Sequence, residues 1–345
     1  MKAAYLNGHG GNEVVLIGER PLPVRKPGEV LVRLRAATLN RVDLYMRDSG
    51  AGITHQLPQI MGLDGAGTVL ETDPEETQLQ PGQQVVLYSG LTCGRCEFCR
   101  RGDGVLCTRM RLLGEHCDGT FAEYISLPAQ NALPMPAGLS VTEAAALGVN
   151  YLTAWRMLFT QGRLKPWETV LVFGIGGGVS LAALQLAKAV GARVFVTSRD
   201  ASKLEKAAAL GADGVIDSRH QDIAKAAMAL TGGRGVDLVI ENVGEAVWAA
   251  ATKSLVRGGR LVTCGATTGD QPPADLRRLF IRQLQVIGST YGNLQEFADM
   301  LQFVERAGLK PVIDSEYGLD EVHGALDRLQ SGQQFGKVAL RISGD

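Results

Sequence analysis

Residues 170–180 read VLVFGIGGGVS: an apolar strand, a glycine loop, and the start of a helix rich in Ala and Leu. Glycine motifs alone are weak signals, but this one has the preceding strand and following helix that a dinucleotide-binding loop requires. Glycines let the backbone turn sharply and approach a pyrophosphate, whose charge is met by free N–H groups at the helix start. The alternative is an ordinary turn between a strand and a helix. The stretch therefore predicts a βαβ unit that binds a dinucleotide.

The residues of this loop that we expect to contact the dinucleotide are Gly174, Gly176, Gly177, Gly178 and Val179. Ser180 departs from the motif, because it stands where a third glycine often allows the helix to pack closely on the strand. Serine is small, so we expect the departure to do little harm.

The type of dinucleotide is read at the end of the next strand, where an acidic residue favours NAD and an arginine accommodates a 2′-phosphate. This chain has Ser198 and Arg199 at that point, and Lys203 lies within reach in the following helix. Two basic side chains suit a phosphate, and no carboxylate stands at 198 to repel it. The sequence therefore predicts NADPH rather than NADH, the alternative being that both basic side chains are ordinary solvated surface charges.

Strands and helices alternate along the chain around this loop. We expect strands over 169–173, 193–198, 236–241, 260–264 and 285–288, and helices over 179–190 and 201–210 that end at glycines. This alternation predicts a doubly wound parallel sheet, a Rossmann domain, over residues 151–290. Asn242 and Val243 follow a strand at the edge where ligands bind to such sheets, and are predicted cofactor contacts, with a plain loop as the alternative.

The first part of the chain has a different pattern. Apolar and polar residues alternate over 30–36, and further short apolar runs at 67–70, 84–88 and 121–127 are separated by turn residues. This pattern predicts a β-rich domain over residues 1–150. Two amphipathic helices, 294–307 and 319–330, and a last strand at 337–342 lead us to expect that residues 291–345 complete it, because chain ends often lie close together.

Composition limits the classes of partner. The 345 residues carry 35 Lys and Arg against 36 Asp and Glu, a net charge of −1. Such a chain has no general attraction for nucleic acid or anionic lipid, and no apolar run approaches the roughly 18 residues of a membrane span. Residues 1–10 do not resemble a signal peptide. We therefore expect a cytoplasmic protein that binds a small-molecule substrate, with no nucleic-acid or membrane partner.

Four cysteines lie close together in the sequence: Cys93, Cys96, Cys99 and Cys107. Their spacing, in a loop rich in Gly and Arg at about residues 90–110, is typical of a tetrahedral zinc site. An iron–sulfur run would normally place the fourth cysteine nearer to the third, and disulfides are disfavoured in the cytoplasm. With four protein ligands the coordination sphere is closed, so the zinc has a structural role. Iron, an oxidised form and an empty site remain as alternatives.

A β-rich first domain, a four-cysteine lobe and a Rossmann domain together resemble the medium-chain dehydrogenase/reductase superfamily over essentially the whole chain. GLDGAG at 62–67, DGTFAEY at 118–124, LTAW at 152–155 and GKV at 336–338 also match its motifs. The resemblance implies a GroES-like fold for the β-rich catalytic domain. It further implies a homodimer or homotetramer, and a place for Lys337 near the cofactor diphosphate, although a charge at a strand edge is an equal alternative.

The chain departs from the zinc alcohol dehydrogenases of this superfamily at their catalytic zinc. Those enzymes hold that metal with a cysteine, a histidine next to a glutamate, and a second cysteine. The matching positions here carry Asn40, Leu63 with Asp64, and Val149. One carboxylate cannot replace the three protein ligands that a catalytic zinc requires, so we expect a structural zinc only.

The segment around residue 40 is similar to the quinone oxidoreductase and enone reductase branch. The predicted catalytic residues are Tyr45, Asn40, Asp43 and Thr153. Tyr45 and Asn40 would stabilise negative charge on a carbonyl oxygen, Asp43 would orient its neighbours, and Thr153 would bond to the nicotinamide. Water could replace Tyr45 as the proton source. The alternatives to such a reductase are a zinc-type alcohol or aldehyde dehydrogenase and a protein that binds NADPH without catalysis.

Overall fold

The structure is a computed structural model that describes residues 1–53, 55–76 and 78–342. Contacts within the chain divide it into two compact units. Unit 1 consists of Met1–Leu152 together with Gly292–Asp345, and unit 2 is Thr153–Tyr291. Unit 2 is therefore an insertion in the chain of unit 1, and each unit is described here by itself.

Unit 2 contains a parallel sheet with the strand order β13-β12-β11-β14-β15-β16, among the residues that the structure describes. This order reverses between β11 and β14, as it does in doubly wound dinucleotide-binding folds, so the predicted Rossmann class is confirmed. Its strands are β11 (Thr169–Val172), β12 (Arg193–Ser198), β13 (Gly214–Asp217), β14 (Val236–Glu241), β15 (Leu255–Thr263) and β16 (Gln285–Gly288).

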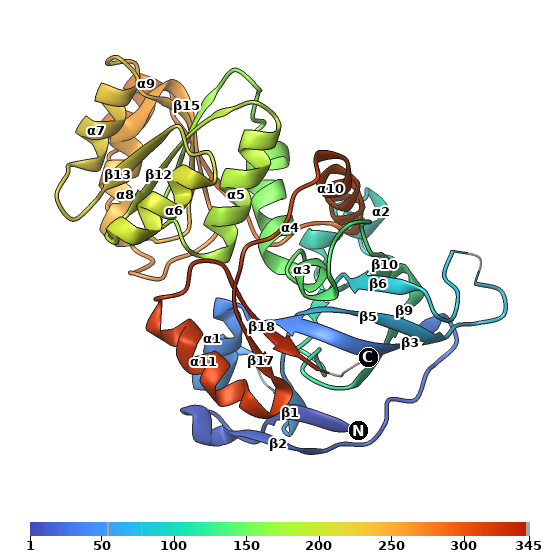
Figure 1. Ribbon diagram of the computed structural model, residues 1–345. Coiled ribbons are helices and arrows are strands. Elements are labelled where there is room, and N and C mark those ends of the chain that lie inside the picture. The colour runs from blue at the N-terminus through green and yellow to red at the C-terminus, as the bar shows by residue number, and fades with distance from the viewer. Residues whose placement is uncertain (54, 77, 343–345) are drawn as a thin grey trace. The chain divides into compact units, whose positions relative to one another are not determined.

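Helices lie on both sides of this sheet (Figure 1). They are α5 (Gly178–Ala189), α6 (Ala201–Ala209), α7 (Ile223–Leu230), α8 (Glu245–Ser254) and α9 (Leu276–Arg282). α7 and α8 pack on the apolar face that includes Leu171, Phe195 and Val239. β11 is buried along its whole length, as expected for a central strand covered on both faces. β13 escaped prediction from sequence because it is short and only one of its residues is buried.

Unit 1 is built around a mixed sheet in the order β10-β6-β5-β3-β18-β17, with β9 also paired to β3, in the described part of the chain. Its strands are β3 (Glu29–Thr38), β5 (Asp64–Glu71), β6 (Gln84–Leu87), β9 (Tyr124–Pro128), β10 (Ala132–Pro134), β17 (Ile313–Gly318) and β18 (Lys337–Arg341). The last strand of the chain pairs with β3, so the C-terminal segment completes a sheet that the N-terminal segment begins.

Smaller elements surround this sheet (Figure 1). They are β1 (Lys2–Leu6), β2 (Val15–Glu19), α1 (Arg41–Asp48), β4 (Gln59–Ile60), β7 (Gly90–Leu91), α2 (Glu97–Arg100), β8 (Arg111–Leu112), α3 (Val141–Ala145), α4 (Val149–Trp155), α10 (Leu294–Ala307) and α11 (Val322–Ser331). α1 and α11 contact each other and share one apolar core that includes Leu44, Met46 and Leu326. Two segments far apart in the sequence thus bury their apolar faces together.

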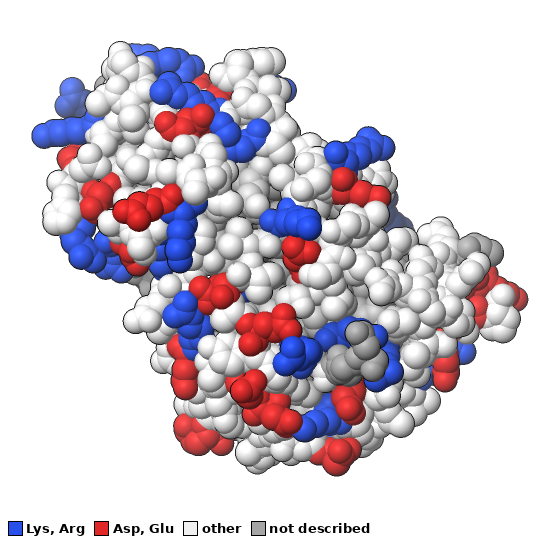
Figure 2. All heavy atoms as spheres, in the orientation of Figure 1, with Lys and Arg blue, Asp and Glu red and all other residues white. Residues whose placement is uncertain are grey.

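The surface shows no single-sign field on the face drawn in Figure 2, where Lys and Arg are interspersed with Asp and Glu. Throughout the described residues, every helix is too short or too polar to cross a lipid bilayer.

Two of the buried carboxyl groups of unit 1, Asp43 and Glu115, have raised pKa values. Asp43 is 1% exposed and Glu115 is 9% exposed. Burial raises the pKa of each to about 7, since a carboxylate loses its hydration in the protein interior. The Asn40 N–H, which donates to Asp43 Oδ2 at 2.6 Å, opposes this rise for Asp43, and nearby Asp64 and Glu115 add to it.

These two groups give the fold a pH dependence whose sign is fixed. In the unfolded chain both carboxyls lose their protons near about pH 4, but in the fold they retain them up to about pH 7. The folded state therefore binds more protons in this interval, and the free energy of unfolding falls as the pH rises. We expect Asp43→Asn to flatten this decline in urea titrations across the interval. Glu305→Gln, an exposed site on α10, should keep the wild-type slope, and a wild-type slope in Asp43→Asn would contradict the assignment.

Candidate functional site

The glycine loop after β11 has the geometry of a backbone cradle. Gly174 and Gly176 have φ angles of +67° and +115°, a region that side chains other than glycine rarely adopt. A Cβ placed on Gly176 would lie 2.8 Å from Lys203 Cδ and 3.3 Å from its Nζ. The Lys203 side chain thus lies against the loop, and the positive φ at Gly176 favours glycine there.

The start of α5 is open to an anion. Gly177 precedes the helix in an extended conformation, and no side chain caps the N–H groups of the first turn. Ser180, where a third glycine often stands, is fully buried and donates its hydroxyl to Gly174 O at 2.8 Å and Gly177 O at 3.0 Å. The serine therefore holds the loop closed instead of loosening it. Free N–H groups at a helix start suit a pyrophosphate.

The residues that are predicted to distinguish NADPH from NADH lie where β12 ends. Ser198 is 9% exposed and its Oγ accepts the Asp200 N–H at 3.0 Å. Arg199 is exposed, and no ion pair of its guanidinium is found among the described residues. Lys203 thus places one basic side chain against the loop, and Arg199 directly follows the end of β12.

The end of β14 completes the cradle. A Cβ on Gly174 would lie 3.2 Å from Val243 Cγ2 and 3.6 Å from Asn242 Oδ1, so both predicted contacts flank the loop. Glu241 is fully buried and accepts N–H groups from Val243 and Gly244, the latter at 2.7 Å, and the Thr263 hydroxyl at 3.0 Å. Sequence reasoning missed this organising role. The available signal was a carboxylate that ends an apolar strand.

Unit 1 holds a buried polar network at the positions that match the catalytic zinc ligands of the resembled enzymes. Lys337, 4% exposed, donates its ammonium to Asn40 Oδ1 at 2.7 Å, Asp64 Oδ2 at 3.0 Å and Asn150 Oδ1 at 2.9 Å. Asp64 Oδ2 also accepts the Thr38 hydroxyl at 2.8 Å and Asn40 Nδ2 at 2.9 Å. Each of the three N–H donors of the ammonium therefore has an acceptor.

The other oxygen of Asp64 is held by the backbone, because the Val149 N–H donates to Asp64 Oδ1 at 2.7 Å. A Cβ on Gly148 would lie 2.2 Å from the same oxygen, so a glycine is needed there. Asn150 and Thr38 were not singled out from the sequence, because nothing local marks a partner so distant along the chain.

The predicted catalytic residues lie in different surroundings. Asn40 begins α1 and is 3% exposed, with both ends of its amide engaged by Asp64 and Lys337. Asp43 accepts the Asn40 N–H, which fits the orienting role expected of it. Tyr45, further along α1, is 41% exposed. Thr153 is the first residue of unit 2 and is 6% exposed.

The four cysteines come together in unit 1, with their sulfur atoms all within 4.8 Å of one another. Cys96 Sγ lies 3.5 Å and Cys93 Sγ lies 4.0 Å from Cys99 Sγ. Four sulfurs bound to zinc at about 2.3 Å stand about 3.8 Å apart, so the cluster matches a tetrahedral metal site. In the described residues no other group of three or more His, Cys, Asp or Glu side chains could hold a metal ion.

Backbone N–H groups favour the thiolate form that a metal needs. The Cys99 N–H lowers the pKa of Cys96 to about 6, and the Arg95 and Cys96 N–H groups lower that of Cys93. Burial raises the pKa of Cys99 to about 11. Cys107 Sγ accepts N–H groups of Cys93 and Arg109, both at 3.4 Å. The donor set and its spacing therefore fit zinc.

Two family models match this chain. The zinc-binding dehydrogenase model matches residues 178–306, and the alcohol dehydrogenase GroES-like domain model matches residues 26–137. Together the two ranges cover more than half of the chain. The predicted GroES-like class of unit 1 is thereby confirmed.

Similar proteins extend over nearly the full length. A solved structure of an NAD-dependent alcohol dehydrogenase has 40% sequence identity and a TM-score of 0.96, and the match covers 99% of this chain and 100% of that one. A thermostable alcohol dehydrogenase from Pyrobaculum aerophilum, solved with cobalt and zinc bound, has 34% identity and a TM-score of 0.89, with 99% of each chain covered. An alcohol dehydrogenase from Geobacillus stearothermophilus is 33% identical over 94% of this chain and 97% of its own. The chain therefore belongs to the medium-chain dehydrogenase/reductase superfamily, among its zinc-binding, alcohol-dehydrogenase-like members, and is an NAD(P)-dependent oxidoreductase.

Proposed function

We propose that this protein uses NADPH to reduce a quinone, or a C=C bond conjugated to a carbonyl group, and that its zinc is structural. The observation that carries the proposal is the buried network of Lys337, Asp64 and Asn40. It stands where the resembled zinc enzymes have the ligands of a catalytic metal.

The side chains of this network do not suit a catalytic zinc. Leu63 is aliphatic and 2% exposed, and residue 149 is a valine whose contact with Asp64 is made by its backbone N–H. The carboxylate of Asp64 is the only anionic ligand at these matched positions, and its oxygens are engaged by Lys337, Thr38, Asn40 and Val149. Zinc in catalytic sites is bound by three protein ligands plus an open position.

A buried ion pair, with no net charge, occupies the proposed site. The Lys337 ammonium is nearly fully buried and is neutralised by Asp64. Burial strengthens the attraction within the pair, because little water is present to screen it. Asn40 lies 2.7 Å from this ammonium, which polarises its amide.

The proposed reaction needs a hydride and a proton. NADPH, when bound, supplies the hydride. As a C–H bond forms at the β-carbon of an enone, the C=C electron pair moves toward the carbonyl oxygen, where negative charge develops. The Tyr45 phenol, 41% exposed on α1, is the proposed hydrogen-bond donor to that oxygen, and Tyr45 or water delivers the proton that completes the saturated product. Thr153 is proposed to bond to the nicotinamide.

The second candidate is oxidation of an alcohol with NAD(P). It is supported by the names of the similar proteins, which are called alcohol dehydrogenases. Names of relatives support this candidate better than the reductase, whereas the residues at 40, 63 and 149 favour the reductase. A metal count separates the two, because a zinc alkoxide mechanism needs a second metal ion.

We expect turnover of a quinone or an enone with NADPH, and about one zinc per chain, the content of a closed four-ligand site. The measurements are a substrate panel followed at the nicotinamide absorbance and metal analysis of the same preparation. Oxidation of alcohols together with about two zinc ions per chain would establish the second candidate instead. Tight NADPH binding without turnover of any substrate would favour a non-catalytic cofactor-binding protein.

We expect NADPH to bind more tightly than NADH, because Arg199 and Lys203 present positive charge beside the loop. Arg199→Ala should weaken NADPH binding by about tenfold, the loss of roughly one charge-assisted contact, and leave NADH binding unchanged. Arg277→Ala is the matched control, since Arg277 is another exposed arginine of unit 2, on α9. Fluorescence titration of both cofactors gives the result, and equal affinity of the wild type for the two would defeat the proposed preference.

The buried ion pair should have a large and coupled effect on stability. Asp64→Asn leaves the Lys337 ammonium without its counter-charge, and should lower the free energy of unfolding by about 3–5 kcal/mol. Adding Lys337→Met should restore part of that loss, because the unpaired charge is then gone. Glu316→Gln, which breaks the exposed pair with Arg341, should cost about 1 kcal/mol or less. Urea denaturation measures all of these, and additive single effects would disprove the coupling.

A further inference from the structure

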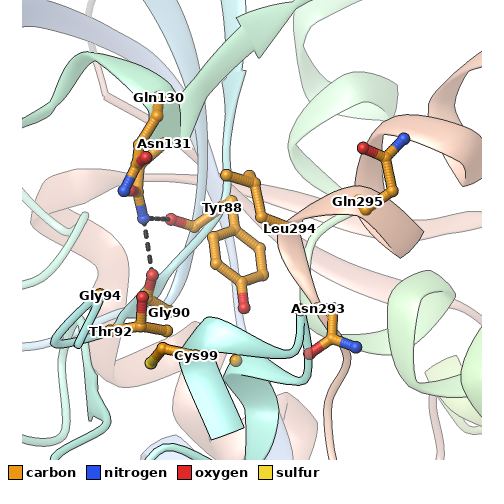
Figure 3. A pocket seen from close by; sticks show the side chains of 12 residues that line it. Tyr88, Gly90, Thr92, Gly94, Cys99, Gln130, Asn131, Asn293, Leu294 and Gln295 are labelled. Atoms are coloured by element: carbon orange, nitrogen blue, oxygen red, sulfur yellow. Dashed lines mark hydrogen bonds between the residues drawn. The ribbon is translucent and has the colours of Figure 1, made fainter. Parts of the chain in front are cut away.

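A small polar pocket of about 190 Å³ separates the four-cysteine lobe, residues 93–107, from the start of α10. Figure 3 shows its lining, where the side chains of Tyr88, Asn131, Asn293 and Gln295 surround the gap and Cys99 lies at its edge. The lining is uncharged. The Asn131 amide group is already engaged by nearby backbone, because its Nδ2 donates to Tyr88 O at 2.8 Å and Gly90 O at 2.7 Å.

Asn293 bridges this gap to the lobe. Its Oδ1 accepts the Val105 N–H at 2.7 Å, and its Nδ2 lies 3.4 Å from Asp103 Oδ1. Val105 belongs to a 3-10 turn, Gly104–Leu106, which leads directly into Cys107. No side chain of the turn caps its own first N–H groups. Asn293 thus supplies the missing acceptor from another element of the fold.

The lobe has little else to hold it. Within residues 93–107, only Val105 and Cys107 are buried. A segment with so little apolar burial depends on its metal and on a few polar contacts for its conformation. The bond from Val105 to Asn293 is one of those contacts, and it lies two residues from a metal-binding cysteine.

Asn293 also lies next to the point where the chain returns to unit 1. Its N–H donates to Glu296 Oε2 at 2.7 Å, which closes the start of α10. Gly292, the first residue of the return, accepts the buried Tyr88 hydroxyl at 2.8 Å. A Cβ on Gly292 would lie 2.5 Å from Leu152 Cδ1, and Leu152 is the last residue before the chain leaves unit 1.

We propose that Asn293 is a positioning residue that couples the four-cysteine lobe to residues 292–296, so that metal bound in the lobe also orders the re-entry of the chain into unit 1. The coupling runs in both directions, because it is a binding free energy shared by two segments. It does not depend on the substrate or on the cofactor type, and rests only on that part of the proposed function which assigns a zinc to the four cysteines.

The first test is zinc release from the full-length protein loaded with zinc, measured with a chromogenic chelator. Asn293→Ala should release zinc about tenfold faster than the wild type, the size of effect that partners of metal-binding segments have on affinity. Gln295→Ala is the control: it removes an amide from the same pocket, and within the described part of the chain Gln295 donates to Asp299 of its own helix, at 2.9 Å, and not to the lobe. Equal release from the two variants would overturn the proposal.

The second test needs no substitution and so does not depend on whether a variant folds. Hydrogen exchange of the wild type is compared with and without zinc. Removal of zinc should lower the protection of the Val105 amide and of amides at 292–296, while β3 and β5 keep theirs. The coupling would be overturned if the protection of amides at 292–296 did not change when zinc is removed, or if the lobe took up no zinc.

Discussion

The ion pair of Lys337 and Asp64 joins three strands of unit 1. Thr38, the last residue of β3, is paired with Ala339 of β18 on one side and with Asp64 of β5 on the other. The ion pair therefore links β18 and β5 across the end of β3, which lies between them. The Thr38 hydroxyl at this end donates to Asp64. A buried charge with any partner missing is costly, so the network is stable only as a whole.

The proposed function differs from the activity in the relatives' names because of the side chains in this network. The same strands and loops that carry metal ligands in the zinc enzymes carry an amide, an aliphatic side chain and a buried ion pair here. A fold hosts different chemistries because function depends on the side chains of a site and not on the arrangement of strands and helices alone. Whole-chain similarity thus identifies the oxidoreductase superfamily, whereas the reaction is decided by a handful of side chains.

The sequence was sufficient for the parts of the fold that depend on local pattern. The glycine loop, the alternation of strands with helices and the cysteine spacing are each local, and the predicted fold classes are confirmed. β13 was missed because its four residues carry almost no apolar pattern.

The site residues were harder to foresee because they depend on distant pairing. Lys337 was expected beside a diphosphate or, equally, as a charge at a strand edge, and its ammonium donates to Asn40, Asp64 and Asn150, from 187 to 297 positions away. Asn40 was expected as a donor to substrate, which stays a prediction, and its amide also bonds to Asp64 and Lys337. No periodicity encodes such partners, because only the sheet order brings them together.

The insertion of unit 2 into the chain of unit 1 has one more consequence. The chain leaves at Leu152 and returns at Gly292, and the Leu152 side chain packs where a Cβ of residue 292 would be. If residues 153–291 were replaced by a short flexible linker between these two ends, unit 1 would be one continuous chain. Its sheet would remain intact, since β18 and β3 are both kept. The chain therefore leaves and re-enters unit 1 at one place, where the Leu152 side chain meets residue 292.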